Sequence, residues 1–267
     1  MISTFALHPA ASKRLIARAT AALPQVQNAY QNGKIFIGHG TTNAALISEL
    51  TGVQIDDLTP YVSGVVSNHA PCATDAATRK QPWCIEKGKI IAADWLEFLD
   101  GFQAGDVFIK GANAVDPQGN VGILIGNPTG GTMGKAYGTL MARGIEIIHP
   151  VGLEKLVPSC LEAQTDLGIN HAGPRIGLQL GYIVLHNSTI ITEIESIAQL
   201  FGLKARMIAA GGIGGMEGSV ILSVKSDEAS RLEDLVGTVK KLNQTPPAKI
   251  SKKKCTHCPN PCLMKEE

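Results

Sequence analysis

The sequence predicts an α/β fold in which a mostly parallel, Rossmann-like sheet carries helices on both faces, followed by a small ferredoxin-like α+β unit and a cysteine-rich tail. Short apolar runs alternate with helical patterns, as expected for parallel strands joined by crossover helices. Hydrophobic residues make up 44 % of the 267 residues and aromatic residues only 4 %, so the core must be aliphatic. Many of the 29 glycines sit in short clusters, which indicate loops where the backbone approaches a ligand closely.

The first zone begins with a helix over 12–22, which Pro24 limits. A buried strand over 34–38 leads into a helix over 41–50, which begins at a threonine and ends at Gly52. Further along, the pattern predicts the helices 94–102, 134–143 and 153–163 and the strands 61–66, 106–110, 122–125 and 146–149.

Breakers between Gly168 and Gly177 mark a domain boundary. We therefore expect a large α/β domain over 1–175, a smaller unit over 176–243 and a tail over 244–267. The smaller unit is predicted to contain the strands 181–185, 206–210 and 220–224 and the helices 191–201 and 227–242. The order β-α-β-β-α suggests a ferredoxin-like unit that lacks or shares one strand.

Charge and hydropathy exclude several classes of protein. Lys+Arg 24 nearly balances Asp+Glu 23, so we expect no nucleic-acid partner. No window approaches ~20 apolar residues and the N-terminus has no compact apolar region, so we expect no membrane span, no secretion signal and a cytoplasmic location. The basic, Ala-rich stretch with Lys13, Arg14 and Arg18 could mimic an organelle transit peptide, but the strand that soon follows favours a first helix.

The motif Gly38-His-Gly-Thr-Thr-Asn43 lies between a buried strand and a helix start. Free backbone amides and the helix dipole attract anions at such a point, and glycine lets a ligand approach the backbone. No lysine follows at the Walker spacing. The candidate ligand-binding residues are Gly38, Gly40, Thr41, Thr42 and Asn43; the alternative is a tight turn with a threonine cap.

A second motif, Lys110-Gly-Ala-Asn-Ala-Val-Asp116, lies at the end of another buried strand. Ligands of open parallel sheets bind outside the carboxyl ends of the strands. Gly111 and Asn113 are therefore candidate ligand-binding residues, and Asp116 is a candidate catalytic residue. The same segment also forms a polar turn over 116–119.

A third motif, Gly126-Asn-Pro-Thr-Gly-Gly-Thr-Met-Gly-Lys135, opens a helix and is a second candidate anion site. Because both Gly-rich turns are expected to follow strands of one sheet, the loops 38–43 and 126–135 should converge on one ligand. The candidate residues of this loop are Thr129, Gly130, Gly131 and Thr132 for binding and Lys135 for catalysis.

Glu154, in the segment Gly152-Leu-Glu-Lys-Leu-Val-Pro158 after a strand, is a candidate nucleophile or base. Equally, it could be a first-turn carboxylate that the helix dipole favours. The Gly-rich segment 209–218 links two strands and does not open a helix, so it predicts a flexible hairpin loop and no dinucleotide site. We expect a homo-oligomer in which this loop closes over a neighbour's cleft.

Together these motifs resemble the superfamily of ribose-5-phosphate isomerase, glucosamine-6-phosphate deaminase and the CoA transferases. The resemblance rests on the strand 34–38 with its glycine turn, on 106–121 and on 126–135, and it covers roughly residues 30 to 160. The segment 151–158 is similar to a stretch of the lactate-utilisation proteins of the same fold. The resemblance implies that a small anionic metabolite, a sugar phosphate or a CoA thioester, binds at these loops.

The resemblance identifies the fold better than the reaction. The sugar-phosphate isomerases usually have Asp where this chain has Asn113, and no segment matches the glutamate motif of the CoA transferases. An isomerase or CoA-transferase-like enzyme would use Asn113 and Asp116 to orient the substrate and Glu154 or Lys135 for acid–base or nucleophilic work. The alternatives are a sensor that kept the pocket without the chemistry, and an electron-transfer accessory protein.

The tail contains Cys255-Thr-His-Cys258-Pro-Asn-Pro-Cys262 after three lysines. Thiolates at this spacing suit zinc or an iron–sulfur cluster, and His257 or a distant cysteine could be the fourth ligand. The predicted metal ligands are Cys255, Cys258 and Cys262. The alternatives are incidental cysteines in a disordered tail and a redox-active dithiol. Pro246 and Pro247 are expected to detach the tail from the domain.

Overall fold

A six-stranded mixed sheet forms the centre of the computed structural model, which describes residues 1–67, 69–171, 173–258, 262 and 263. In spatial order its strands are β12 (Thr189–Ile191), β10 (Glu146–Pro150), β7 (Val107–Ile109), β2 (Lys34–Ile37), β5 (Trp83–Glu86) and β6 (Lys89–Ile91). The first four strands are parallel to one another, β5 is antiparallel to β2, and β6 is antiparallel to β5. The predicted α/β class with a mostly parallel main sheet is confirmed.

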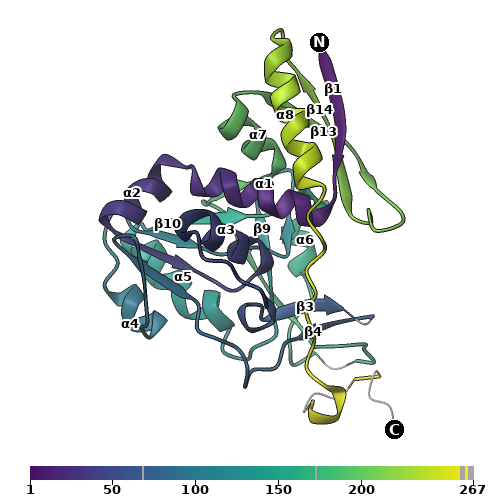
Figure 1. Ribbon diagram of the computed structural model, residues 1–267. Coiled ribbons are helices and arrows are strands. Elements are labelled where there is room, and N and C mark those ends of the chain that lie inside the picture. Colours follow the sequence, from purple (N-terminus) through teal and green to yellow (C-terminus); the bar gives the residue numbers. More distant parts are fainter. Residues whose placement is uncertain (68, 172, 259–261, 264–267) are drawn as a thin grey trace.

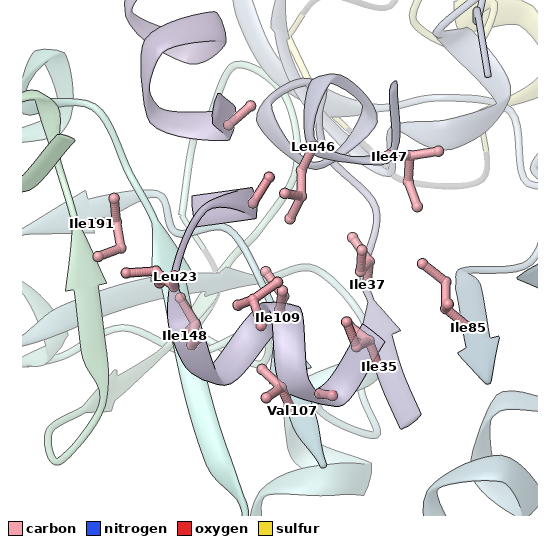
Figure 2. Close-up of a cluster of buried hydrophobic side chains, with 14 of the residues drawn as sticks. Leu23, Ile35, Ile37, Leu46, Ile47, Ile85, Val107, Ile109, Ile148 and Ile191 are labelled. Atoms are coloured by element: carbon pink, nitrogen blue, oxygen red, sulfur yellow. The ribbon is translucent and has the colours of Figure 1, made fainter. Parts of the chain in front are cut away.

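Alternate residues of the central strands enter two different cores, because successive side chains of a strand point to opposite faces. On one face, Ile35 and Ile37 of β2 pack with residues of three helices, α1 (Pro9–Ala21), α2 (Pro24–Asn32) and α3 (Thr41–Thr51). Figure 2 shows both isoleucines in one buried cluster with Leu46 of α3. On the other face, Phe36 stacks on Phe108 at 4.4 Å between ring centroids and packs against α4 (Trp95–Asp100) and α5 (Gly131–Arg143).

Two smaller antiparallel arrangements flank the main sheet. A three-stranded sheet has the order β11 (Gly181–Leu185), β9 (Val121–Ile125) and β8 (Ala114–Val115), and a separate hairpin consists of β3 (Gly64–Ser67) and β4 (Ala70–Ala73). The expectation that the run 122–125 belongs to the parallel sheet is wrong: β9 pairs with β8 and β11. An apolar run of five residues has the same composition in either sheet, so the sequence does not specify its partner.

The first residues of the chain complete a sheet formed by its last strands. Strand β1 (Ile2–Leu7) pairs with β14 (Ser219–Lys225), which pairs with β13 (Lys204–Gly211). This sheet packs on α7 (Glu193–Phe201) and α8 (Ala229–Leu242), as Figure 1 shows. The sequence analysis did not predict β1. The expectation that the strand 181–185 belongs to this smaller unit is wrong, because β11 pairs with β9 in another sheet.

Helix α1 connects the two parts of the fold. Leu15 packs into the core of the β1-β14-β13 sheet, whereas Ile16 packs into the core under the main sheet. The main sheet also includes a strand from beyond the predicted boundary at residue 176, because β12 pairs with β10.

Several predicted elements differ in their bounds. Pro24 does not only limit α1, since it is also the first residue of α2, where its missing N–H costs no hydrogen bond. The predicted helix 153–163 is a 3₁₀ turn, η2 (Leu153–Lys155), followed by α6 (Cys160–Gln164). The predicted strand 61–66 is divided between the 3₁₀ turn η1 (Thr59–Tyr61) and β3. Among the described residues, no helix has the length and apolar character needed to cross a membrane.

The tail is not detached from the domain. After α8 it runs the length of the molecule to the hairpin β3–β4, where it forms the 3₁₀ turn η3 (Cys255–His257), as Figure 1 shows in yellow. The backbone N–H of Lys253 donates a hydrogen bond of 2.9 Å to the carbonyl of Ala73 on β4. Pro246 and Pro247 therefore begin an extended segment that docks elsewhere on the molecule.

Candidate functional site

Lys110 lies at the carboxyl end of β7, beside the end of β2. Its ammonium donates a hydrogen bond of 3.2 Å to the carbonyl of Gly111, and its side chain crosses Gly38, where an added Cβ would lie 2.7 Å from the Lys110 Cδ. Burial, followed by the charge of nearby Lys155, lowers the pKa of Lys110 to about 8. The absence of a side chain at position 38 thus gives room for the lysine.

Lys155 lies at the carboxyl end of the neighbouring strand β10, in η2. Its ammonium donates a hydrogen bond of 3.0 Å to the carbonyl of Ala112. Burial lowers its pKa, Lys13 adds to that effect, and the carboxylates of Glu154 and Glu193 oppose it. In the described part of the chain, no ion pair includes Lys110 or Lys155. Two half-buried ammonium groups therefore lie close together without a bound carboxylate.

Two histidines beside Lys110 are neutral at pH 7, because burial lowers the pKa of each to about 4. His39 Nε2 lies 2.8 Å from the carbonyl of Lys80, which can only accept, so the proton is on Nε2 and Nδ1 accepts from Ser63. His149, on β10, donates from Nδ1 to the carbonyl of Lys110. Its Nε2 is fully buried and has no hydrogen-bond partner among the described residues.

The Gly38–Asn43 loop lies next to this lysine pair. The Gly38 amide donates to Ile109 and the Gly40 amide to Tyr61, so neither is available to an anion. The amides that the loop offers are those of the first turn of α3, from Thr41 to Asn43. The Asn43 side chain is buried and donates 2.7 Å to the Gly38 carbonyl, which fixes the turn. Gly40, and not a threonine, is the residue that caps α3.

Asp116 has a structural role, because its carboxylate binds backbone and side-chain groups of the protein itself. Its carboxylate is buried and accepts hydrogen bonds from the amides of Gln118, Asn120 and Cys160 and from the Asn120 side chain, at 2.8–3.1 Å. Burial would raise its pKa, but these hydrogen bonds outweigh burial and lower it. The carboxylate thus holds the turn before β9 and the start of α6, and it has no free oxygen directed at a substrate.

Asn113 is also used locally, because its side-chain oxygen accepts 3.1 Å from the Leu124 amide and joins the segment before β8 to β9. Gly111 follows Lys110 and supplies the carbonyl that accepts from its ammonium. Neither geometry supplies a base where the isomerases use an aspartate.

The Gly126–Lys135 loop does not follow a strand of the main sheet, so the basis for expecting it to meet the 38–43 loop is wrong. It follows β9, and the helix that it opens, α5, packs on the opposite face of the main sheet from α3. Thr129 folds back on Asn127, to which its hydroxyl and amide donate at 2.8 Å. Gly130 and Gly131 adopt positive φ at the start of α5, Thr132 lies in the first turn, and Lys135 is exposed.

The acidic side of the site consists of Glu154 and Glu193. Glu154 lies 3.7 Å from the Lys13 ammonium, so it is paired at least in part. Glu193 is fully buried at the start of α7 and accepts 2.9 Å from the Leu153 amide. Burial raises its pKa, and the negative charge of Glu154 adds to this effect. An added Cβ at Gly152 would lie 3.2 Å from Glu193 Oε1, so this glycine gives the carboxylate room.

Sequence reasoning did not select Lys110, Lys155, His39 or His149 as site residues. Lys110 lies inside the motif 110–116 and Lys155 inside the segment 152–158. The available signal was position, because each lysine follows a buried strand directly or closely. Their burial, which decides their chemistry, depends on the packing of β7 against β10.

No protein-family model matches this chain, and it has no significant match to a curated protein or to a solved structure. The resemblance to the isomerase and CoA-transferase superfamily therefore rests on the motifs alone and stays a prediction.

Proposed function

We propose that this protein binds a small anionic metabolite, of the sugar-phosphate or CoA-thioester class, at the carboxyl ends of β2, β7 and β10. One observation carries the proposal: Lys110 and Lys155 are two half-buried ammonium groups without an ion pair in the described chain. Burying charge without a partner is costly, and a bound anion would compensate both lysines at once.

The neighbouring groups suit such a ligand. The first-turn amides of α3 can donate to anionic oxygens, and the helix dipole adds positive potential. Binding and not isomerisation is proposed, because Asp116 and Asn113 serve the fold. The non-catalytic sensor is therefore favoured over the isomerase.

Amine chemistry at Lys110 is a second candidate function. With a pKa of about 8, roughly one tenth of this lysine is a neutral amine at pH 7. A desolvated lysine beside another cation is the type that forms a Schiff base with a carbonyl compound, releasing water. Reduction with borohydride in the presence of a phosphorylated aldehyde would fix the adduct on Lys110, and peptide mapping would locate it.

Titration calorimetry tests the proposal with inorganic phosphate, ribose 5-phosphate and CoA. We expect at least one of them to bind to the purified chain. The double variant Lys110→Met, Lys155→Met should weaken that binding by about 100-fold or more, since each charge-assisted hydrogen bond contributes about 1.5–3 kcal/mol. The matched control Lys89→Met removes an exposed lysine at the far edge of the sheet and should change nothing. Equal affinity in the double variant would refute the site.

A further inference from the structure

The tail brings its cysteines to a cysteine that is distant in sequence. The hydrogen bond from the Lys253 amide to the Ala73 carbonyl places the start of the cysteine motif beside Cys72, the preceding residue of β4. A second hydrogen bond of 2.9 Å, from the Leu263 amide to the Arg175 carbonyl, holds the residue after Cys262. Both ends of the motif are therefore attached to the body of the protein.

A lysine ammonium contacts one of these thiols. The Lys252 ammonium is 2.9 Å from Cys255 Sγ. Thiols are poor partners for a lysine compared with a metal ion, for which thiolates are the preferred soft ligands.

The other cysteines are unsuitable as ligands. Cys84 is buried in the core between the main sheet and α4, and burial raises the pKa of its thiol to about 11. Cys160 is buried beside Asp116, and burial raises its pKa as well. A buried neutral thiol in an apolar core does not bind metal readily. Of the three cysteines outside the tail, Cys72 alone is half-buried and next to the motif.

We propose that Cys72 is the fourth ligand of a four-thiolate metal site with Cys255, Cys258 and Cys262. Four thiolates, two of them at a C-x₂-C spacing, are the ligand set of structural zinc and of iron–sulfur clusters. As the described side chains stand, no group of three His, Cys, Asp or Glu residues is arranged around a metal position. Metal binding therefore draws the sulfur atoms together and displaces the Lys252 ammonium toward solvent.

This site differs from the predicted one in joining the tail to the body of the protein. A site made by the tail alone would leave the hairpin β3–β4 unconstrained, whereas ligation by Cys72 ties the two together. It involves none of the residues of the proposed anion site, so either proposal can fail without the other.

The test uses the full chain, prepared anaerobically and loaded separately with zinc, with cobalt(II), or with iron and sulfide. We expect one metal centre per chain, and a brown colour only if an iron–sulfur cluster is the preferred form. Cys72→Ser should weaken zinc binding by about 100-fold or more, because the binding free energy of structural zinc is shared among four ligands. The cobalt spectrum should change from four thiolate ligands to three. The matched control Cys84→Ala should keep both properties.

A second variant tests the displaced cation. Lys252→Met should bind zinc several-fold more tightly than the unmodified chain, because no ammonium competes for the thiolates. Circular dichroism of each variant verifies its fold. A Cys72→Ser variant with the full metal content and the unchanged cobalt spectrum would show that Cys72 is not a ligand. Failure of the unmodified chain to bind any of the three loadings would refute the site as a whole.

Discussion

The lysine pair and the turn at Asp116 belong to neighbouring segments of the chain, yet the fold treats their polar groups in opposite ways. Every oxygen of the buried Asp116 carboxylate accepts a hydrogen bond from the protein. Lys110 and Lys155 donate only to carbonyl groups and form no ion pair in the described chain. The difference teaches that a polar side chain at the end of a strand indicates a ligand only when the protein itself does not supply its hydrogen-bond or charge partners.

The largest expected effect is on stability, at the turn. Asp116→Ala removes the acceptor of three backbone amides, so unfolding should require about 3 kcal/mol less free energy, at ~1–3 kcal/mol per buried group left unpaired. Anion affinity of the folded fraction should stay the same. Urea titration and calorimetry measure the two quantities. A loss of anion affinity with unchanged stability would show that Asp116 serves ligand binding and not the fold.

The lysine should show the opposite behaviour. Lys110→Met should weaken binding of the anion by about 10- to 100-fold, because one charge-assisted hydrogen bond is lost. The unliganded protein should be as stable as before or more stable by about 1 kcal/mol, because a poorly solvated charge is replaced by an apolar side chain of similar length. Lys135→Met, in the second Gly-rich loop, is the comparison. Equal weakening of anion binding by both variants would show that the loop 126–135 also belongs to the binding site.

The pH dependence of sulfate binding isolates the charge of Lys110, because the charge of sulfate itself is constant from pH 7 to 9. With a Lys110 pKa of about 8, sulfate affinity should fall about tenfold over this range, following the protonated fraction of the lysine. His39 and His149 are neutral throughout, and Lys155, whose pKa burial also lowers, is the other cation of the pair. Lys110→Met should remove most of the dependence.

The same pKa predicts the opposite slope for the stability of the unliganded protein. The folded state loses the Lys110 proton near pH 8, whereas the unfolded chain holds it until about pH 10.4. Because the unfolded state then binds more protons, this residue makes stability rise with pH between those values. Urea titrations at pH 8 and pH 10 of the parent and of Lys110→Met isolate its contribution, and a larger rise in the variant would contradict the assignment.

The smallest effect is expected at the glycines. Gly38→Ala places a Cβ against the Lys110 Cδ and should displace the ammonium, with binding weaker by about three- to tenfold. Gly126→Ala is the matched change in the second loop, where an added Cβ would be at ordinary contact distance, 3.5 Å, from Leu178. Affinity that falls in the Gly126 variant alone would contradict the placement of the site.

Local pattern was sufficient for elements with strong periodicity or caps. Asp94, the first residue of the predicted helix 94–102, caps α4, and Gly52 ends α3 in the left-handed conformation. Local pattern was insufficient where the pairing of distant strands decides whether a segment forms a strand. The three residues of β12 form a strand because β10 lies beside them, and β1 finds its partner more than 200 residues away. Neither partner can be identified from a local pattern.

The sequence predicted which segment forms the candidate site, but not which of its side chains are available to a ligand. The Gly38–Asn43 loop does lie at the carboxyl edge of the main sheet, as its position after an apolar run indicated. Asp116 was selected for its chemistry, which its four hydrogen bonds use up. Lys110 was passed over because exposure is the rule for lysine, and only packing shows the exception.

The pairing of β1 with β14 gives the chain a particular history on the ribosome. At ~5–20 residues per second, Lys225 is added roughly 10–45 s after Ile2, the residue with which it pairs. Until then, the strand edge of β1 has no partner, although α1, which follows directly, can already pack on α3. An unpaired apolar strand on a nascent chain is a site for chaperone binding and for aggregation. Slower translation before β14 would therefore lower the yield of folded protein more than slower translation after it.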